Sequence, residues 1–210
     1  AFRQLPNELP ARVLPPQTVG ASREHLRYAG TLSLDPGLIG ELIHQQGTAL
    51  ALSGVRRLVL FNSHGGNLRA MDAAALRLRD ECGILVVKAS YFTFSRPDSV
   101  TLPESEWRHG LHGGAVETAM MLHLCPDLVH TDAIQRFPSL GQDLDGPLRR
   151  VGPEGEASFA WLAGDLNPHG VTGDARLADA ETGQRLVAHY GRVLAEVIQD
   201  ARAFPLDRLV

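Results

Sequence analysis

The chain has 210 residues, and its 20 Lys and Arg against 24 Asp and Glu give a formal net charge of −4. That balance lacks the basic excess typical of nucleic-acid or anionic-membrane binding, and the apolar runs are too short to span a bilayer. The sequence does not begin with the basic segment and apolar run of a signal peptide. Its two cysteines form no metal-binding or disulfide motif. We therefore expect one soluble, cytoplasmic domain over residues 1–210.

Short apolar runs alternate with helical patterns along the chain. Strands are expected at three places: a weaker one at Ala11–Pro15, and two buried ones at Arg57–Phe61 and Ile84–Lys88. Helices are expected after an Asp35 N-cap, over Leu68–Cys82 between an Asn67 cap and a Gly83 stop, over Ala115–Leu124, and from about Asp179. Residues 141–173 have little periodicity and are predicted to form a long ordered loop. This alternation predicts an α/β protein: a three-layer α/β/α sandwich with a mostly parallel central sheet.

The segment Asn62-Ser-His-Gly-Gly-Asn67 joins a predicted buried strand to a helix. It therefore lies at the carboxyl end of the sheet, where α/β proteins bind their ligands. Gly65 and Gly66 allow a sharp turn and the close approach of another group. The alternative is an ordinary strand–helix turn in which His64 only hydrogen-bonds to the backbone. The segment lacks the Gly-Lys-Ser/Thr ending of a phosphate loop.

A second glycine-rich segment, His112-Gly-Gly-Ala-Val-Glu117, enters a predicted helix. Glu117, Met121 and Leu124 share one side of that helix, so the carboxylate is expected on its apolar face. A carboxylate in that position must be paired, hydrogen-bonded or bound to a metal. The alternative is a structural role, in which Glu117 pairs with an arginine and stabilises the positive end of the helix.

Together, His64, His112 and Glu117 offer nitrogen and oxygen ligands or acid–base groups suited to a divalent metal such as zinc, manganese or iron(II). Such a metal polarises a carbonyl group while a nearby His or Glu moves protons. Three further residues are candidate ligands: His25, Asp174 and His169. No Gly-x-Ser-x-Gly motif is present, which disfavours a serine hydrolase.

The two segments closely resemble the paired signatures of the creatininase (creatinine amidohydrolase) family. Similarity extends through Gly20-Ala-Ser-Arg-Glu-His25 and Asn167-Pro-His-Gly-Val-Thr-Gly-Asp174. The resemblance implies an α/β/α fold and a metal-dependent amidohydrolase that acts on a non-peptide or cyclic carbon–nitrogen bond of a small molecule. It also implies a homo-oligomer.

The resemblance further implies roles for individual residues. His64 is expected to bind the metal and His112 to transfer protons, while Glu117 is expected to bind the metal or hold the attacking water. The expected substrate contacts are Ser22, Phe92, Trp107, Gly65 and Gly66.

The chain departs from the family pattern in two ways. Family members carry an upstream Glu-x-His and Asp that supply much of the metal site, and this sequence begins downstream of them, so we expect it to be a truncated version of a longer protein. Gly66 stands where creatinine hydrolases carry a glutamate ligand of the second metal, which argues against a two-metal site and against creatinine as substrate. The competing hypothesis is a non-catalytic binding or assembly protein with an incomplete metal site.

Overall fold

The computed structural model describes residues 1–209, which group into two compact units. The first unit contains residues 1–26, 30–95 and 190–209, and the second contains residues 27–29 and 96–189. Helix α7 (Ala180–Ala203) contributes residues to both units. None of the helices within residues 1–209 combines the length and the apolarity needed to cross a membrane. The single domain expected from the sequence stays a prediction.

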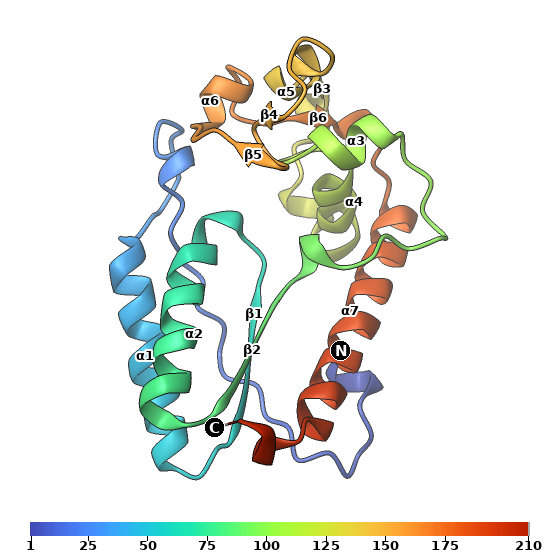
Figure 1. Cartoon of the computed structure of the whole chain (residues 1–210). Coiled ribbons are helices and arrows are strands. Elements are labelled where there is room, and N and C mark those ends of the chain that lie inside the picture. The colour runs from blue at the N-terminus through green and yellow to red at the C-terminus, as the bar shows by residue number, and fades with distance from the viewer. Residues whose placement is uncertain (210) are drawn as a thin grey trace. The chain divides into compact units, whose positions relative to one another are not determined.

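The first unit is built on two parallel strands joined by a helix (Figure 1). Its elements are α1 (Pro36–Leu52), β1 (Arg57–Asn62), α2 (Leu68–Cys82), β2 (Leu85–Ser90) and the second half of α7. Strand β1 pairs with β2 from Arg57 opposite Leu85 to Asn62 opposite Ser90. This parallel β–α–β connection confirms the predicted α/β class.

Helices lie on both sides of the β1–β2 pair within the first unit (Figure 1). Helices α1 and α2 pack together on one side. On the other side, the Arg57 side chain donates hydrogen bonds to the carbonyl oxygens of Ala201 and Phe204, at 2.9 and 3.1 Å. Tyr190 of α7 packs against Tyr91, with ring centroids 5.5 Å apart. The first unit therefore has the predicted α/β/α order of layers.

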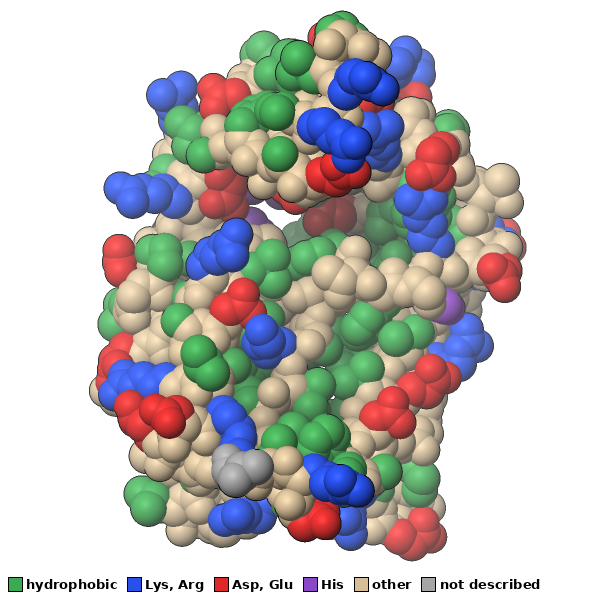
Figure 2. Space-filling view, viewed as in Figure 1, with side chains coloured by type: hydrophobic (Ala, Val, Ile, Leu, Met, Phe, Trp, Pro, Cys, Tyr) green, Lys and Arg blue, Asp and Glu red, His purple; other side chains and the backbone are tan. Residues whose placement is uncertain are grey.

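Strand β1 is less buried than its apolar sequence predicts. Phe61 is 49% exposed, and hydrophobic side chains line the surface between α2 and α7 (Figure 2). Residues Arg57–Leu60 are half-buried, so the elements that pack on β1 cover its faces incompletely, and least at Phe61. The prediction that this strand is buried on both faces is therefore wrong for the described residues.

The local signals at the helix ends are mostly confirmed. The Asp35 carboxylate accepts a 2.8 Å hydrogen bond from the Gly37 N–H and caps α1. Gly83 ends α2 with a left-handed φ of 66°, which a glycine adopts without strain.

The strand predicted at Ala11–Pro15 is absent, and that segment is irregular. Proline lacks the N–H that a strand ladder requires, which explains the difference at Pro15.

The second unit consists of short elements. These are α3 (Glu104–His109), α4 (Ala115–Leu124), β3 (Arg136–Phe137), α5 (Leu140–Leu144), β4 (Val151–Gly152), β5 (Ala157–Ser158), α6 (Ala163–Leu166), β6 (Gly173–Asp174) and the first half of α7. The long loop predicted over residues 141–173 holds only brief helices and two-residue strands. The buried Glu106 carboxylate joins separate segments of the second unit. It accepts hydrogen bonds from the N–H groups of Ala115 and Asp174, at 2.6 and 2.7 Å.

Leu78 provides a test of the packing between α1 and α2. Its side chain is fully buried, and a Cβ atom placed on Gly47 of α1 would lie 2.4 Å from its Cδ1. We expect Leu78→Ala to lower the free energy of unfolding by about 2–5 kcal/mol, because it removes buried methyl groups and leaves a cavity. Urea denaturation measures this change. The matched control is Leu76→Ala on the same helix, where the side chain is 72% exposed. Equal losses in the two variants would contradict this packing.

Candidate functional site

The turn that carries His64 is held by the side chain of Asn62 at the end of β1. The Asn62 amide nitrogen donates to the His64 carbonyl oxygen at 2.9 Å, and its Oδ1 accepts from the His64 N–H at 3.2 Å. Asn62 is itself 7% exposed, so this pairing is shielded from water. The backbone of His64 is therefore fixed at the carboxyl end of the sheet, as the sequence predicts.

Asn67 joins this turn to a distant segment. Its side chain does not cap α2, contrary to the expectation from sequence. Its Oδ1 instead accepts a 2.8 Å hydrogen bond from the buried Ala21 N–H, and its Nδ2 donates to Asn62 Oδ1 at 3.2 Å. The buried Ala21 N–H needs a hydrogen-bond acceptor, and the Asn67 side chain supplies it instead of capping the helix. Residues 20–25 thereby lie against the His64 turn.

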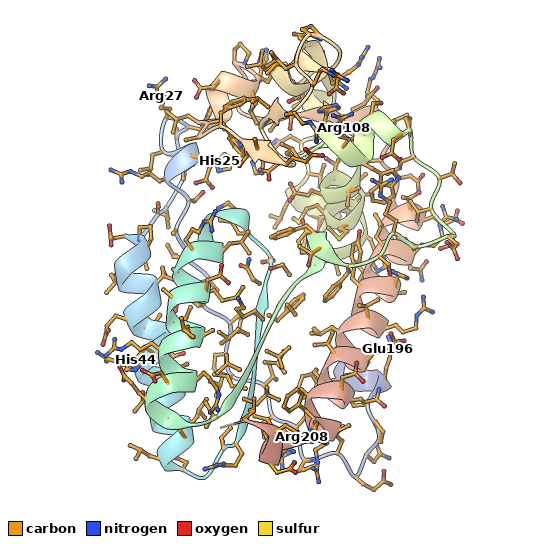
Figure 3. All side chains as sticks on the ribbon, viewed as in Figure 1. His25, Arg27, His44, Arg108, Glu196 and Arg208 are labelled. Atoms are coloured by element: carbon orange, nitrogen blue, oxygen red, sulfur yellow. The ribbon has the colours of Figure 1, made fainter. Side chains whose placement is uncertain are left out.

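Three side chains with metal-ligand atoms meet beside this turn: Glu24, His25 and His64. One carboxylate oxygen, Glu24 Oε1, lies 2.8 Å from His64 Nε2 and 3.3 Å from His25 Nδ1. The three donor atoms all lie within 4.8 Å of one another. His25 belongs to a short 3₁₀ turn (Arg23–His25; Figure 3), and Ser22 Oγ lies 3.1 Å from its Nδ1. Two imidazoles and one carboxylate can therefore bind the same metal ion.

The charge on Glu24 suits that arrangement. Burial raises the pKa of this carboxyl, but the hydrogen bond with His64 and the charges of both histidines lower it, and the net pKa lies below its ordinary value. Glu24 is consequently an anion at neutral pH. The side chains of His64 and Glu24 are 32% and 18% exposed, so solvent reaches the cluster. A carboxylate oxygen between two ring nitrogens is a donor set that suits zinc or another divalent transition metal.

His25 is a candidate ligand from its sequence context, whereas Glu24 is not among the residues predicted from the sequence. The available signal was its place beside His25 in the segment Gly20-Ala-Ser-Arg-Glu-His25, which carries part of the family resemblance. Nothing in the spacing of Glu24 and His64, 40 positions apart, indicates that they meet. The hydrogen bond between Asn67 and Ala21 is one of the tertiary contacts that bring the two segments together.

The two glycines after His64 have different surroundings. A Cβ atom on Gly65 would have nothing within 4 Å, so this side of the turn is open. A Cβ atom on Gly66 would lie 2.2 Å from the Ala21 carbonyl oxygen and 2.9 Å from His64 Nε2. Only glycine fits at position 66 without displacing the backbone of residues 20–25.

His112 and Glu117 lie together in the second unit, at the start of α4. Glu117 Oε2 accepts a 2.7 Å hydrogen bond from the Gly113 N–H and lies 3.5 Å from His112 Nδ1. The backbone of His112 is held by Thr172, whose N–H donates to the His112 carbonyl oxygen at 2.7 Å. The side chains of His112 and Glu117 are 40% and 33% exposed, so both are accessible for proton transfer.

The side of α4 that carries Glu117 is not buried in the second unit. Met121 and Leu124 are 38% and 56% exposed, whereas the buried residues of the helix are Ala115 and Ala119. The expected apolar face is therefore wrong, because small alanines rather than the long side chains make the helix contacts. Glu117 accepts a hydrogen bond from the Gly113 N–H beside the helix start, and its pairing with an arginine stays a prediction.

The remaining predicted residues are divided between the two units. Ser22 and Phe92 belong to the first, where Phe92 is 42% exposed and contacts the Tyr91 ring edge-on. Trp107 belongs to the second, and the Arg96 guanidinium lies 5.1 Å from its ring centroid. The two other candidate ligands also lie in the second unit: Asp174 pairs with Arg176, and His169 packs against Phe137. A single site that contains both His64 and Glu117 stays a prediction.

A sequence model of the creatininase (creatinine amidohydrolase) family matches residues 1–198. The chain belongs to the creatininase family. The mycofactocin precursor peptide peptidase of Mycolicibacterium smegmatis is 31% identical over 183 residues, which are 87% of this chain and 64% of that relative. The chain thus spans less than two thirds of the length of this curated relative.

Solved structures agree with the family assignment. A putative creatinine amidohydrolase from Bacteroides fragilis superposes with a TM-score of 0.73 at 21% identity, over 92% of this chain and 73% of that one, and it shows the common fold. The structure described as "Creatininase Mn" superposes with a TM-score of 0.61 at 28% identity, over 82% of this chain and 67% of that one. The predicted creatininase-like α/β fold is therefore confirmed.

Asn67 allows a test of how the His64 turn is assembled. We expect Asn67→Ala to lower the free energy of unfolding by about 1–3 kcal/mol, because the buried Ala21 N–H loses its acceptor. Urea denaturation measures the loss. Asn67→Asp keeps the oxygen that accepts from Ala21 and is expected to lose less. A larger loss in Asn67→Asp than in Asn67→Ala would show that the contact with Ala21 is not the important one.

Proposed function

We propose that this chain is a metal-dependent amidohydrolase that cleaves a non-peptide or cyclic carbon–nitrogen bond in a small amide, formamide or lactam. The observation that carries the proposal is the cluster of Glu24, His25 and His64. An ionised carboxylate and two imidazoles fit a divalent ion of the zinc, manganese or iron(II) type. The similar solved structure described as "Creatininase Mn" supports a metal at a site of this family.

His64 is the metal ligand in this proposal, and a bound divalent metal supplies Lewis acidity that polarises the amide carbonyl and acidifies water. In the net reaction, the oxygen of water bonds to the carbonyl carbon and the carbon–nitrogen bond breaks. Glu117 would accept the proton that this water loses. His112 passes a proton to the departing nitrogen, so the products are a carboxylic acid and an amine.

The geometry around His112 suits this proton transfer. Glu117 Oε2 lies 3.5 Å from His112 Nδ1, and the Gly113 N–H holds the carboxylate at 2.7 Å. A short movement of either side chain brings the two atoms to hydrogen-bond distance. Both side chains are partly exposed, so a small substrate reaches them without unfolding the helix start.

Two residues favour a substrate other than creatinine. Gly66 carries no side chain that contacts a ligand, and Phe92 offers an aromatic ring without a hydrogen-bond donor. Gly65 lies beside open space, which leaves room for an amide group next to His64. The named relatives act differently from one another, one as a precursor peptide peptidase and the other as a creatininase.

A substrate panel tests the proposed function. The full chain is loaded in turn with Zn²⁺, Mn²⁺ and Fe²⁺ and is given N-formyl compounds, lactams, creatinine and a short peptide. We expect metal-dependent hydrolysis of a formamide or lactam that is faster than hydrolysis of creatinine or the peptide, and a chelator removes it. Creatinine or the peptide as the fastest substrate contradicts the proposed bond type, and no hydrolysis at all favours the non-catalytic binding protein.

Glu117→Gln separates catalysis from structure. If Glu117 moves protons, the rate should fall at least roughly 10²-fold, the usual scale for a general acid–base group, because an amide cannot accept the proton. The free energy of unfolding should change by no more than about 1 kcal/mol, since the glutamine oxygen can still accept from the Gly113 N–H. Turnover and urea denaturation are measured together. Glu181→Gln, a 78% exposed carboxylate of the same unit, is the matched control. A stable Glu117→Gln variant with unchanged turnover assigns Glu117 to structure alone.

A further inference from the structure

We propose that Glu24 is a metal ligand and that it binds one divalent transition metal together with His25 and His64, entirely within the first unit. This inference rests on the proposed function only for the use of the metal. It assigns the ligands from the described residues of this chain. It also explains why residue 66 is a glycine.

The distances from Glu24 Oε1 to the two histidine nitrogens are close to those between ligands of one ion, and all three donors lie within 4.8 Å of one another. Bonds of roughly 2.0–2.2 Å in a tetrahedral arrangement place neighbouring donor atoms about 3.4 Å apart. Glu24 Oε1 already lies 3.3 Å from His25 Nδ1. The separation between Glu24 Oε1 and His64 Nε2 is 2.8 Å and has to widen by about 0.6 Å to reach that spacing. Rotations of the side chains supply such a change without movement of the backbone.

The backbone of the first unit fixes the direction from which the carboxylate comes. A side chain at position 66 would collide with the Ala21 carbonyl oxygen, which lies 2.2 Å from the Cβ position. The same Cβ position is only 3.1 Å from Glu24 Oε1. Glu24 therefore occupies the space beside His64 that a side chain on residue 66 would otherwise enter. A glycine at 66 and a carboxylate at 24 are parts of one arrangement.

The donor set also limits the kind of metal. Two imidazole nitrogens favour zinc, cobalt, nickel or iron(II) over magnesium and calcium, which prefer all-oxygen sites. The three protein ligands leave a fourth position open, as in catalytic zinc sites. His64 is 32% exposed and Gly65 lies beside open space, so water can fill that position.

The same unit contains a control pair with the same contact but without the third donor. His44 Nε2 lies 2.8 Å from Glu81 Oε2, the distance found between His64 and Glu24. Among the described residues, this pair is not part of a group of three metal-ligand side chains. An isolated His–Glu contact is therefore expected to bind metal far more weakly.

Calorimetric titration of the chelator-treated full chain with Zn²⁺ tests the ligand assignment, and Co²⁺ absorption reports the coordination geometry. We expect one tight ion in the wild type. Glu24→Gln and His25→Ala are expected to lower the affinity at least 10-fold and to weaken the visible bands of four-coordinate Co²⁺, whereas Glu81→Gln is expected to change neither. Circular dichroism before titration confirms that each variant is folded.

A pair of glycine variants tests the same site without removing a donor. Gly66→Ala is expected to weaken Zn²⁺ binding at least 10-fold because its methyl group displaces Ala21 and Glu24. Gly40→Ala in α1, whose Cβ would lie 3.5 Å from the Ala70 carbonyl oxygen, is the control and is expected to leave the affinity unchanged. The inference is overturned if the wild type binds no Zn²⁺, or if Glu24→Gln retains wild-type affinity. Retained amide hydrolysis with a Glu24→Gln variant of unchanged affinity refutes the ligand assignment alone, and Glu24-dependent binding without hydrolysis of any amide refutes the proposed function alone.

Discussion

The hydrogen bond from the Ala21 N–H to Asn67 Oδ1 joins two segments that lie 46 positions apart in the chain. On one side of it, Asn62 fixes the backbone of His64 at the end of β1. On the other side, residues 22–25 bring Glu24 and His25 against the His64 ring. The candidate metal site therefore depends on tertiary hydrogen bonds of residues 20–25. The bond to Asn67 is the one that also contacts the strand end, and Ser33 and Leu34 hold the same segment. The residues of the site come from two separate segments that pack together, and no short sequence motif contains all of them.

This arrangement explains which parts of the fold the sequence can predict. The parallel strands, the turn at His64 and the left-handed Gly83 follow from local rules of apolar runs and glycine conformation, and the structure has them. Asn67 was expected to cap α2 because asparagine at a helix start commonly does so. Its side chain has a second possible partner, the Ala21 N–H, that no local pattern reveals. Glu24 was missed for the same reason.

The second unit shows the same limit. The proximity of His112 and Glu117 follows from their positions around a helix start. The burial of Glu106 does not follow from its neighbours, because its partners are backbone N–H groups of Ala115 and Asp174, which belong to separate segments. Exposure of Met121 and Leu124 is likewise a tertiary property, since helical spacing indicates a shared side but not whether that side is covered.

We infer that Glu24, His25 and His64 of this chain together hold one divalent metal ion. A crystal structure of the full chain soaked with Zn²⁺, with an anomalous difference map at the zinc edge, decides whether they do. We expect an anomalous peak at bonding distance, roughly 2.0–2.2 Å, from Glu24 Oε1, His25 Nδ1 and His64 Nε2. A peak that contacts His64 but neither Glu24 nor His25 would contradict this inference.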